Sequence, residues 1–184
     1  MNSTLNNLNN NSCTKCFLCR ERTNIVIGRG TDARVRTLII GEAPGAEEDE
    51  TGEPFKGQSG KLLDDAIHPY MDSIYITNLV KCRPPNNRNP TAIEIATCKP
   101  YLEQQIVDME PERVIILGRV PFTAMFPNIS GTRMLDWIEN GPYTYKDLRG
   151  RSIPVHVRYH PAYILRNRSK TDAWKANLRE LMES

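Results

Sequence analysis

The chain has 184 residues, of which 39% are hydrophobic and 25% charged, and its formal net charge is +2. These values are ordinary for a soluble globular protein with one core, and no apolar run approaches the roughly 20 residues that a membrane span requires. The N-terminus lacks the apolar segment of a secretory signal, so we expect a cytoplasmic protein that is not secreted, or a nuclear one in a cell with a nucleus.

The pattern along the chain is that of alternating strands and helices. Residues 1–12 contain six Asn and are typical of a disordered tail. Short apolar runs rich in β-branched residues predict strands at 36–40, 73–77, 113–117 and 153–159. Helices are predicted at 60–70, from Thr91 onward, at 120–125 and at 172–182. The inward residues of the last helix are predicted to be Ala173, Trp174, Leu178 and Leu181.

The helix that begins near Thr91 has two opposing signals. Thr91 and Glu94 form a capping box, which marks a helix start. Pro90 precedes this start and Pro100 falls inside the helix, so we expect a broken helix rather than one long one.

Strands that alternate with helices predict a three-layer α/β/α sandwich around a central, mostly parallel, four-stranded sheet. We expect residues 13–184 to form a single domain. Ligands bind at the carboxyl ends of the strands in such a sheet. The predicted strand ends therefore gather a carboxylate (Glu42), an amide (Asn78) and an imidazole (His160) along one edge.

Charge is unevenly distributed along the chain. Six carboxylates lie within residues 42–53, whereas residues 146–184 hold nine Lys or Arg against four acidic residues. A basic C-terminal part could follow phosphates while the acidic loop does chemistry. A solvated surface of mixed sign is the simpler interpretation, and it is favoured on charge alone.

Five cysteines in a chain without a secretory signal favour a metal or redox role over disulfides. Cys13 and Cys16 form a CxxC pair, and Cys82 and Cys98 are candidates for the other half of a site. Thiolates suit zinc or an iron–sulfur cluster, and the wide second pair fits a cluster somewhat better than a zinc ribbon. Cys19 makes a second CxxC with Cys16, so spacing alone leaves the spare cysteine undetermined.

Four motifs follow one another in order. The first is C-x-x-C-x-L at 13–18 with Arg-Thr-Asn at 22–24, and the second joins GEAPGAEE at 41–48 to PFKGQSGKLL at 54–63. The third is YITNLVKCRPP at 75–85 with Cys98 downstream, and the fourth is YHPAYILR at 159–166. Together they resemble the family 4 uracil-DNA glycosylases, the iron–sulfur type. The similarity covers nearly the whole chain and is weakest over residues 129–148, where no motif is recognised.

This resemblance implies a DNA repair enzyme of the base excision type. It would flip uracil out of single-stranded DNA or out of U:G and U:A duplexes, hydrolyse its N-glycosidic bond and leave an abasic site. The expected partner is uracil-containing DNA, with no membrane; we expect a monomer, and any replication or repair protein partner is unknown. The implied cofactor is a [4Fe–4S] cluster on Cys13, Cys16, Cys82 and Cys98, with Cys19 spare. Its expected role is structural, holding the loop 83–89 against DNA.

The resemblance also assigns roles in catalysis and uracil binding. His160 would donate a hydrogen bond to uracil O2 as the base departs, and Glu42 would place the attacking water or stabilise the cationic sugar. Phe55 would stack on the flipped base and Asn78 would read its edge. The remaining residues assigned to the substrate pocket are Gly41 and Glu48, and Glu48 would line the pocket or help to exclude a methyl group at C5. The neighbouring acids Glu47, Asp49 and Glu50 are predicted to be solvated.

DNA contacts are predicted from the loop and helix around the fourth motif. Ile164 or Leu165 would be the apolar wedge that fills the gap left by the flipped base. Arg166 and Arg88 would contact phosphates.

Three alternatives compete with this interpretation. A covalently trapping relative has Gln where this chain has Ala43 and carries a His in an added basic loop, yet residues 84–90 contain no His. A catalytically silent DNA-binding iron–sulfur module would not need Glu42, Phe55, Asn78 and His160 together. A plain zinc protein would lack the visible absorbance of a cluster.

Overall fold

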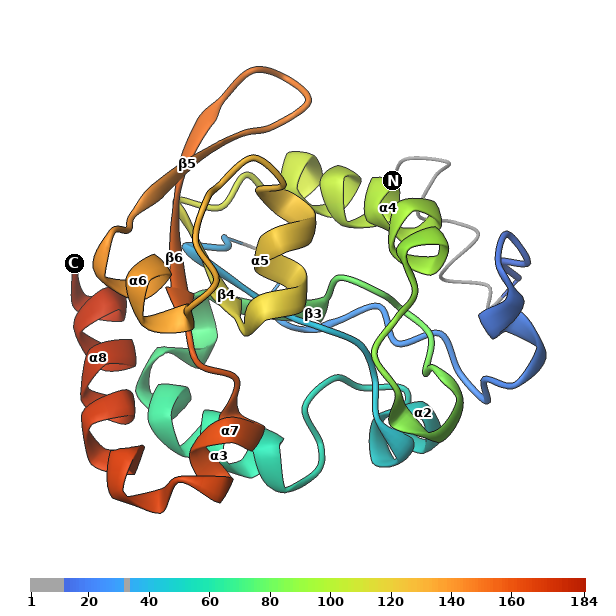
Figure 1. Ribbon diagram of the computed structural model, residues 1–184, viewed down its shortest axis with the longest axis horizontal. Helices are drawn as coiled ribbons and strands as arrows, with labels where there is room; N and C mark the ends of the chain where they lie inside the picture. The colour runs from blue at the N-terminus through green and yellow to red at the C-terminus, as the bar shows by residue number, and fades with distance from the viewer. Residues whose placement is uncertain (1–11, 32–33) are drawn as a thin grey trace.

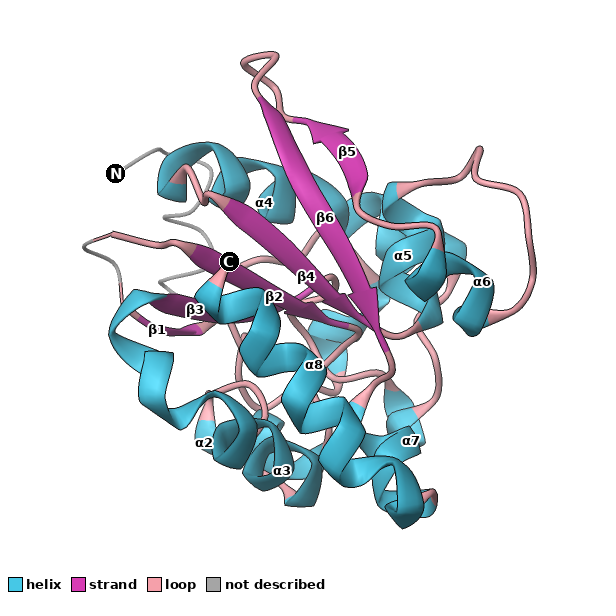
Figure 2. Ribbon diagram, turned by 90° about the vertical axis from the view of Figure 1, so that its left-hand side faces the viewer, coloured by secondary structure: helices cyan, strands magenta, loops and turns pink. Residues whose placement is uncertain are grey.

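A mixed β-sheet runs through the molecule between two layers of helices (Figures 1 and 2). The computed structural model describes residues 12–31 and 34–184, so the predicted disordered tail lies outside the described residues except for Ser12. Within these ranges six strands are hydrogen-bonded in the order β1-β3-β2-β4-β6-β5. The strands are β1 (Arg29–Gly30), β2 (Thr37–Gly41), β3 (Ile74–Asn78), β4 (Arg113–Leu117), β5 (Tyr143–Lys146) and β6 (Ser152–Arg158).

The four inner strands β3, β2, β4 and β6 are mutually parallel and lie within one residue of the predicted runs, which confirms the α/β sandwich. The prediction of four strands is too low, because β1 and β5 add antiparallel edges, with Arg29 opposite Ile76 and Tyr143 opposite Val155. β1 is two residues long, and β5 alternates half-buried and exposed side chains. Neither edge strand therefore contains the apolar run that marks a central strand.

The helices are α2 (Ala46–Thr51), α3 (Gln58–Ile67), α4 (Ala92–Met109), α5 (Arg119–Met125), α6 (Met134–Glu139), α7 (Pro161–Arg166) and α8 (Thr171–Glu183). Short 3₁₀ helices are η1 (Phe17–Arg20), η2 (His68–Ser73), η3 (Pro85–Asn87) and η4 (Arg168–Lys170).

Helix α4 contradicts the predicted break. The capping box is present, since the Thr91 side chain accepts from the Glu94 N–H and the Glu94 carboxylate accepts from the Thr91 N–H. The helix then continues through Pro100 to Met109. Proline removes one backbone bond from the ladder, but Cys98, Tyr101 and Leu102 on either side of it are buried in the core. Tertiary packing outweighs the local penalty here.

Each face of the sheet has its own core. One face carries Leu38 and Ile40 and is covered by α4, α5 and α6; the other carries Ile39 and is covered by α3, α7 and α8 (Figure 2). In α8, Trp174, Leu178 and Leu181 face the core as predicted. The prediction for Ala173 is wrong, since it is exposed and Met182 takes its place, two helical turns beyond Trp174.

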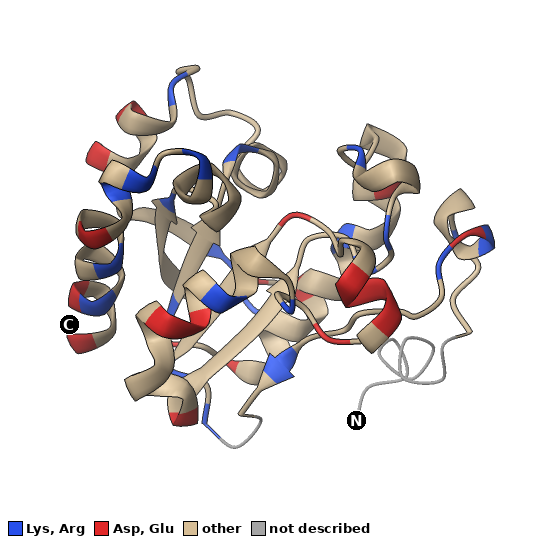
Figure 3. Cartoon of the chain, turned by 90° about the horizontal axis from the view of Figure 1, so that it is seen from below, with Lys and Arg blue, Asp and Glu red and all other residues tan. Residues whose placement is uncertain are grey.

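This topology gathers the carboxyl ends of the parallel strands at one edge, with Gly41 ending β2, Asn78 ending β3 and His160 two residues beyond β6. Figure 3 shows acidic segments and basic segments interleaved along α8, so the basic C-terminal part carries both signs. None of the helices in the described part of the chain is long and apolar enough to cross a bilayer.

Candidate active site

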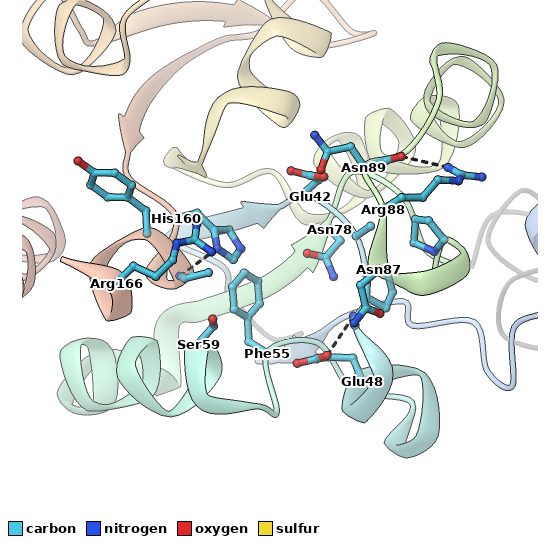
Figure 4. Close-up of a pocket in the computed structure, with 16 residues that line it drawn as sticks. Glu42, Glu48, Phe55, Ser59, Asn78, Asn87, Arg88, Asn89, His160 and Arg166 are labelled. Atoms are coloured by element: carbon cyan, nitrogen blue, oxygen red, sulfur yellow. Dashed lines mark hydrogen bonds between the residues drawn. The ribbon is translucent and has the colours of Figure 1, made fainter. Parts of the chain in front are cut away.

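A cavity of about 580 Å³ opens at the carboxyl edge of the sheet (Figure 4). It collects side chains from motifs that are far apart in the sequence. The predicted site residues that line it are Glu42, Glu48, Phe55, Asn78, Arg88, His160 and Arg166. The structure thus brings the predicted uracil-binding and catalytic side chains to one place.

His160 enters the cavity as a neutral hydrogen-bond donor. Its Nδ1 accepts a hydrogen bond from the Ala162 N–H at 3.2 Å and so caps α7, which leaves the imidazole proton on Nε2. Burial and, to a smaller extent, the nearby Arg166 lower the pKa of His160 to about 4. The ring is therefore uncharged at neutral pH, with a single N–H free to donate.

Phe55 stacks on this imidazole. The two ring centroids are 5.7 Å apart and the planes differ by 30°. The Phe55 backbone has a φ of 55°, a left-handed conformation that is rare for a bulky residue. The first turn of α3 packs directly against this backbone. A Cβ on Gly60 would lie 1.7 Å from the Phe55 carbonyl oxygen, so this close contact requires glycine. A strained backbone thus directs the aromatic ring into the cavity.

Glu48 lines the cavity with both carboxylate oxygens already engaged. One oxygen accepts from the Gly45 N–H at 3.0 Å, and the other accepts from the N–H groups of Lys56 and Gly57 at 2.9 and 3.1 Å. These bonds tie the start of α2 to the loop that carries Phe55. Glu48 therefore shapes the wall of the cavity.

Asp49 corrects a prediction. It was expected to be solvated, yet it is 3% exposed, because its carboxylate accepts from the backbone N–H groups of Thr23 and Asn24 at 3.0 to 3.2 Å. The Asn24 side chain returns a bond to the Asp49 carbonyl at 2.8 Å. The segment that follows the first cysteines is thereby anchored to α2.

Asn78 and Gly41 are register partners on neighbouring strands. Asn78 is buried, and Figure 4 shows it between Glu42 and Phe55. A Cβ on Gly41 would lie 2.4 Å from Asn78 Oδ1 and 2.6 Å from the Phe55 ring, so only glycine fits beneath these two side chains. Burial raises the pKa of Glu42, whose side chain faces the same cavity.

The predicted DNA-contacting residues separate into two groups. Arg166 is exposed at the cavity, and Leu165 is half-buried just outside it. Ile164 is fully buried in the core with α3 and α8, so the structure rules it out as a wedge. The Arg88 guanidinium lines the cavity but is paired with both Glu94 carboxylate oxygens at 2.7 and 2.8 Å. That pairing reduces its availability to a phosphate.

The lining residues that the sequence did not assign to the site include Ser59, Asn87 and Asn89. Asn87 has a φ of 54° and accepts from Arg83 Nε at 2.7 Å. The Pro-Pro-Asn-Asn run was a visible turn signal. Nothing local indicated that this turn would reach across to the strand ends.

Four cysteines surround a second, smaller cavity, which is lined by Cys13, Cys16, Cys82 and Cys98 but not by Cys19. Burial raises the pKa of Cys82 to about 12, so its thiolate needs a bound cation. Within the described ranges, no three Cys, His, Asp or Glu side chains form a group that could hold a single metal ion. Four thiolates are a soft donor set of the kind that holds zinc or an iron–sulfur cluster. The donor set fits an iron–sulfur cluster.

Comparisons with known proteins agree with this geometry. The family model of the "Uracil DNA glycosylase superfamily" matches residues 27–182. The type-4 uracil-DNA glycosylase of Pyrobaculum aerophilum is 41% identical over 160 residues, covering 84% of this chain and 80% of that protein. The corresponding enzyme of Sulfurisphaera tokodaii is 39% identical over 180 residues, covering 94% and 76%, and that of Thermotoga maritima is 40% identical over 161 residues, covering 85% and 80%.

Proposed function

Because the chain belongs to the uracil DNA glycosylase superfamily and is similar to its type-4 enzymes over most of its length, we propose that it is a DNA repair hydrolase that removes uracil from DNA. The observation that carries the proposal is the neutral His160 facing Phe55 and Asn78 in one cavity. These three side chains supply a leaving-group donor, a stacking surface and an edge reader. The product is an abasic site.

Uracil reaches the cavity only after it leaves the base stack, so recognition begins with base flipping, which costs a few kcal/mol. Phe55 stacks on the flipped ring, which contributes about 1–3 kcal/mol without distinguishing bases. Asn78 distinguishes uracil from cytosine. Its amide donates to O4 and accepts from N3–H of uracil, whereas cytosine presents the reverse pattern.

In the chemical step the N-glycosidic bond breaks, its electron pair stays on uracil N1, and the sugar develops cationic character. His160 Nε2–H donates to O2, where the negative charge of the departing base accumulates. The Glu42 carboxylate stabilises the cationic sugar and accepts the proton of the water that adds to C1′. Because Glu42 is held in a partly desolvated position, its negative charge acts at short range.

Leu165 is the wedge candidate that remains once Ile164 is assigned to the core. It lies in α7, the helix that His160 caps, so one short element carries both the wedge candidate and the leaving-group donor. Arg166, next along the same helix, is suited to a flanking phosphate.

We also propose that Cys13, Cys16, Cys82 and Cys98 hold a [4Fe–4S] cluster. When bound, the cluster supplies a cross-link between the N-terminal segment, the loop after β3 and helix α4. Measured iron and acid-labile sulfide, with a visible charge-transfer band, would support it, and stoichiometric zinc without that band would overturn it.

Incubation with a single-stranded oligonucleotide that contains one uracil, followed by alkali, tests the glycosylase. We expect cleavage at the uracil and none in matched oligonucleotides with cytosine or thymine at that position. A strand that survives alkali while forming a covalent or long-lived complex would favour the trapping relative. A strand that survives without any complex would remove the proposal.

A further inference from the structure

A lysine is buried between the uracil cavity and the cysteine site. Lys81 has no exposed surface, although lysine is among the residue types that are least often buried. It lies three residues after Asn78 and immediately before Cys82. Nothing in the proposed reaction uses it, so its position calls for a separate explanation.

Three oxygen atoms surround the Lys81 Nζ, which are Thr77 Oγ1 at 2.6 Å, the Asn78 carbonyl at 2.6 Å and Gln105 Oε1 at 2.5 Å. The Thr77 hydroxyl donates its own proton to the Ile27 carbonyl at 2.6 Å, so its oxygen is an acceptor toward lysine. Gln105 also uses its amide N–H on the Ile27 carbonyl, at 3.1 Å, which turns its oxygen toward lysine. The three acceptors match the three N–H donors of the ammonium form.

This ammonium fixes the main chain of the residue that would read uracil. Asn78 ends β3, and the chain beyond it stays beside β2, with Leu79 N–H donating to the Gly41 carbonyl and Val80 N–H to the Glu42 carbonyl. The Lys81 side chain then turns back toward β3, and its Nζ donates a hydrogen bond to the Asn78 carbonyl. On the neighbouring strand the Gly41 backbone lies close to the Asn78 side chain, since a Cβ there would be 2.4 Å from Asn78 Oδ1.

The same residue contacts the cysteine site. The Lys81 backbone N–H donates to Cys98 Sγ at 3.3 Å, and Lys81 lines the cavity that the four cysteines share. A thiolate that holds a cluster carries negative charge, which strengthens a hydrogen bond from this backbone N–H.

Resting on the proposed function, we propose that Lys81 is a positioning residue that holds Asn78 in place for uracil and couples this position to the four-cysteine site. The Lys81 side chain donates to the Asn78 carbonyl, and the Lys81 backbone N–H donates to Cys98 Sγ. Lys81 itself does not reach the substrate, since Asn78 and the strand end lie between them.

The test compares Lys81→Met with Lys99→Met. Both remove one ammonium and keep a side chain of similar length, but Lys99 is partly exposed and pairs with Glu103 on the same helix. In Lys81→Met we expect the inhibition constant for free uracil to rise by roughly 10- to 100-fold, as a small misplacement of a binding group produces. Affinity for DNA that carries an abasic-site analogue, and iron per chain, stay at the wild-type level. Lys99→Met behaves as wild type throughout.

A folded Lys81→Met protein that binds free uracil as tightly as wild type overturns the inference. Equal losses for uracil and for abasic-site DNA also overturn it, since they describe general destabilisation. If Lys81→Met does not fold, Gln105→Met removes one of the three acceptors instead, and an unchanged uracil constant there is the refuting result. A wild-type protein that leaves uracil-DNA intact refutes the proposed function and this inference together, whereas an active wild type with an unaltered Lys81→Met refutes the inference alone.

Discussion

The tautomer and charge of His160 give the sharpest test of the proposed chemistry. Asn is the informative replacement, because its side-chain oxygen can accept from the Ala162 N–H and keep α7 capped, as the imidazole does at 3.2 Å. Asn cannot reach the departing base. We therefore expect His160→Asn to retain stability within about 1 kcal/mol, while the single-turnover excision rate falls by roughly 10²- to 10³-fold, the cost of losing one preorganised donor.

The charge state predicts a pH dependence. With a pKa of about 4, imidazolium makes up only about 1% of His160 at pH 6, so the single-turnover rate should show no histidine inflection between pH 8 and 6. The unfolded chain binds this proton near pH 6.5 and the folded chain only near pH 4. Folding stability therefore falls as the pH drops between these values, by at most about 3 kcal/mol for this group.

Two measurements check this reasoning. ¹⁵N NMR of the histidines should find the Nε2–H tautomer of His160 at pH 7, and urea denaturation at pH 7 and pH 4.5 should show a smaller acid loss in His160→Asn than in wild type. His68→Ala, at an exposed position, is the control for the rate. A His160 that titrates near pH 6.5, or a His160→Asn protein with the wild-type rate, would refute the assigned role.

Four further substitutions test how the cavity is built. Gly41→Ala places a methyl group where no space exists beneath the pocket side chains, and we expect kcat/KM on uracil-DNA to fall about 100-fold and the unfolding free energy by about 1–3 kcal/mol. Leu165→Ala should slow excision from duplex DNA more than excision from single strands. Ile164→Ala should instead lower the unfolding free energy measured in urea by about 2–5 kcal/mol, because it leaves a cavity at a core position. Asp49→Ala leaves two backbone N–H groups without their acceptor; we expect it to cost about 1–3 kcal/mol and to lower iron per chain, while the exposed Glu50→Ala does neither.

The inner strands and the strand-end residues were predictable because they depend on local pattern. A β-branched run that ends in Gly41 or Asn78 identifies both a buried strand and the residue at its carboxyl end. Parallel pairing then brings these ends together without further information. The edge strands β1 and β5 were missed, since an antiparallel edge of two to four residues needs only a partner with free hydrogen-bonding groups.

The distinction between Ile164 and Leu165 was not predictable from the sequence. The two are adjacent, similar in size and on one short helix, and only the rotation of α7 decides which one faces the core. That rotation is set by the cap at His160 and by the packing of α7 on α3. The burial of Asp49 was equally unpredictable. A carboxylate within an acidic run is normally solvated, and its backbone donors, Thr23 and Asn24, lie 25 to 26 residues earlier in the chain.

The hydrogen bonds around the cysteine segments indicate a structural role for the proposed cluster rather than a role in the chemical step. On one side, the backbone N–H groups of Thr23 and Asn24 bind the Asp49 carboxylate in α2. Glu48, the preceding residue of α2, accepts a hydrogen bond from the backbone of the loop that carries Phe55. From the other side, Lys81 holds Asn78. The two side chains that would grip uracil are thus each connected to a cysteine segment by a short series of hydrogen bonds. His160 has a different support, the cap of α7. We therefore expect the proposed cross-link among the cysteines to affect the positions of Phe55 and Asn78 more than that of His160.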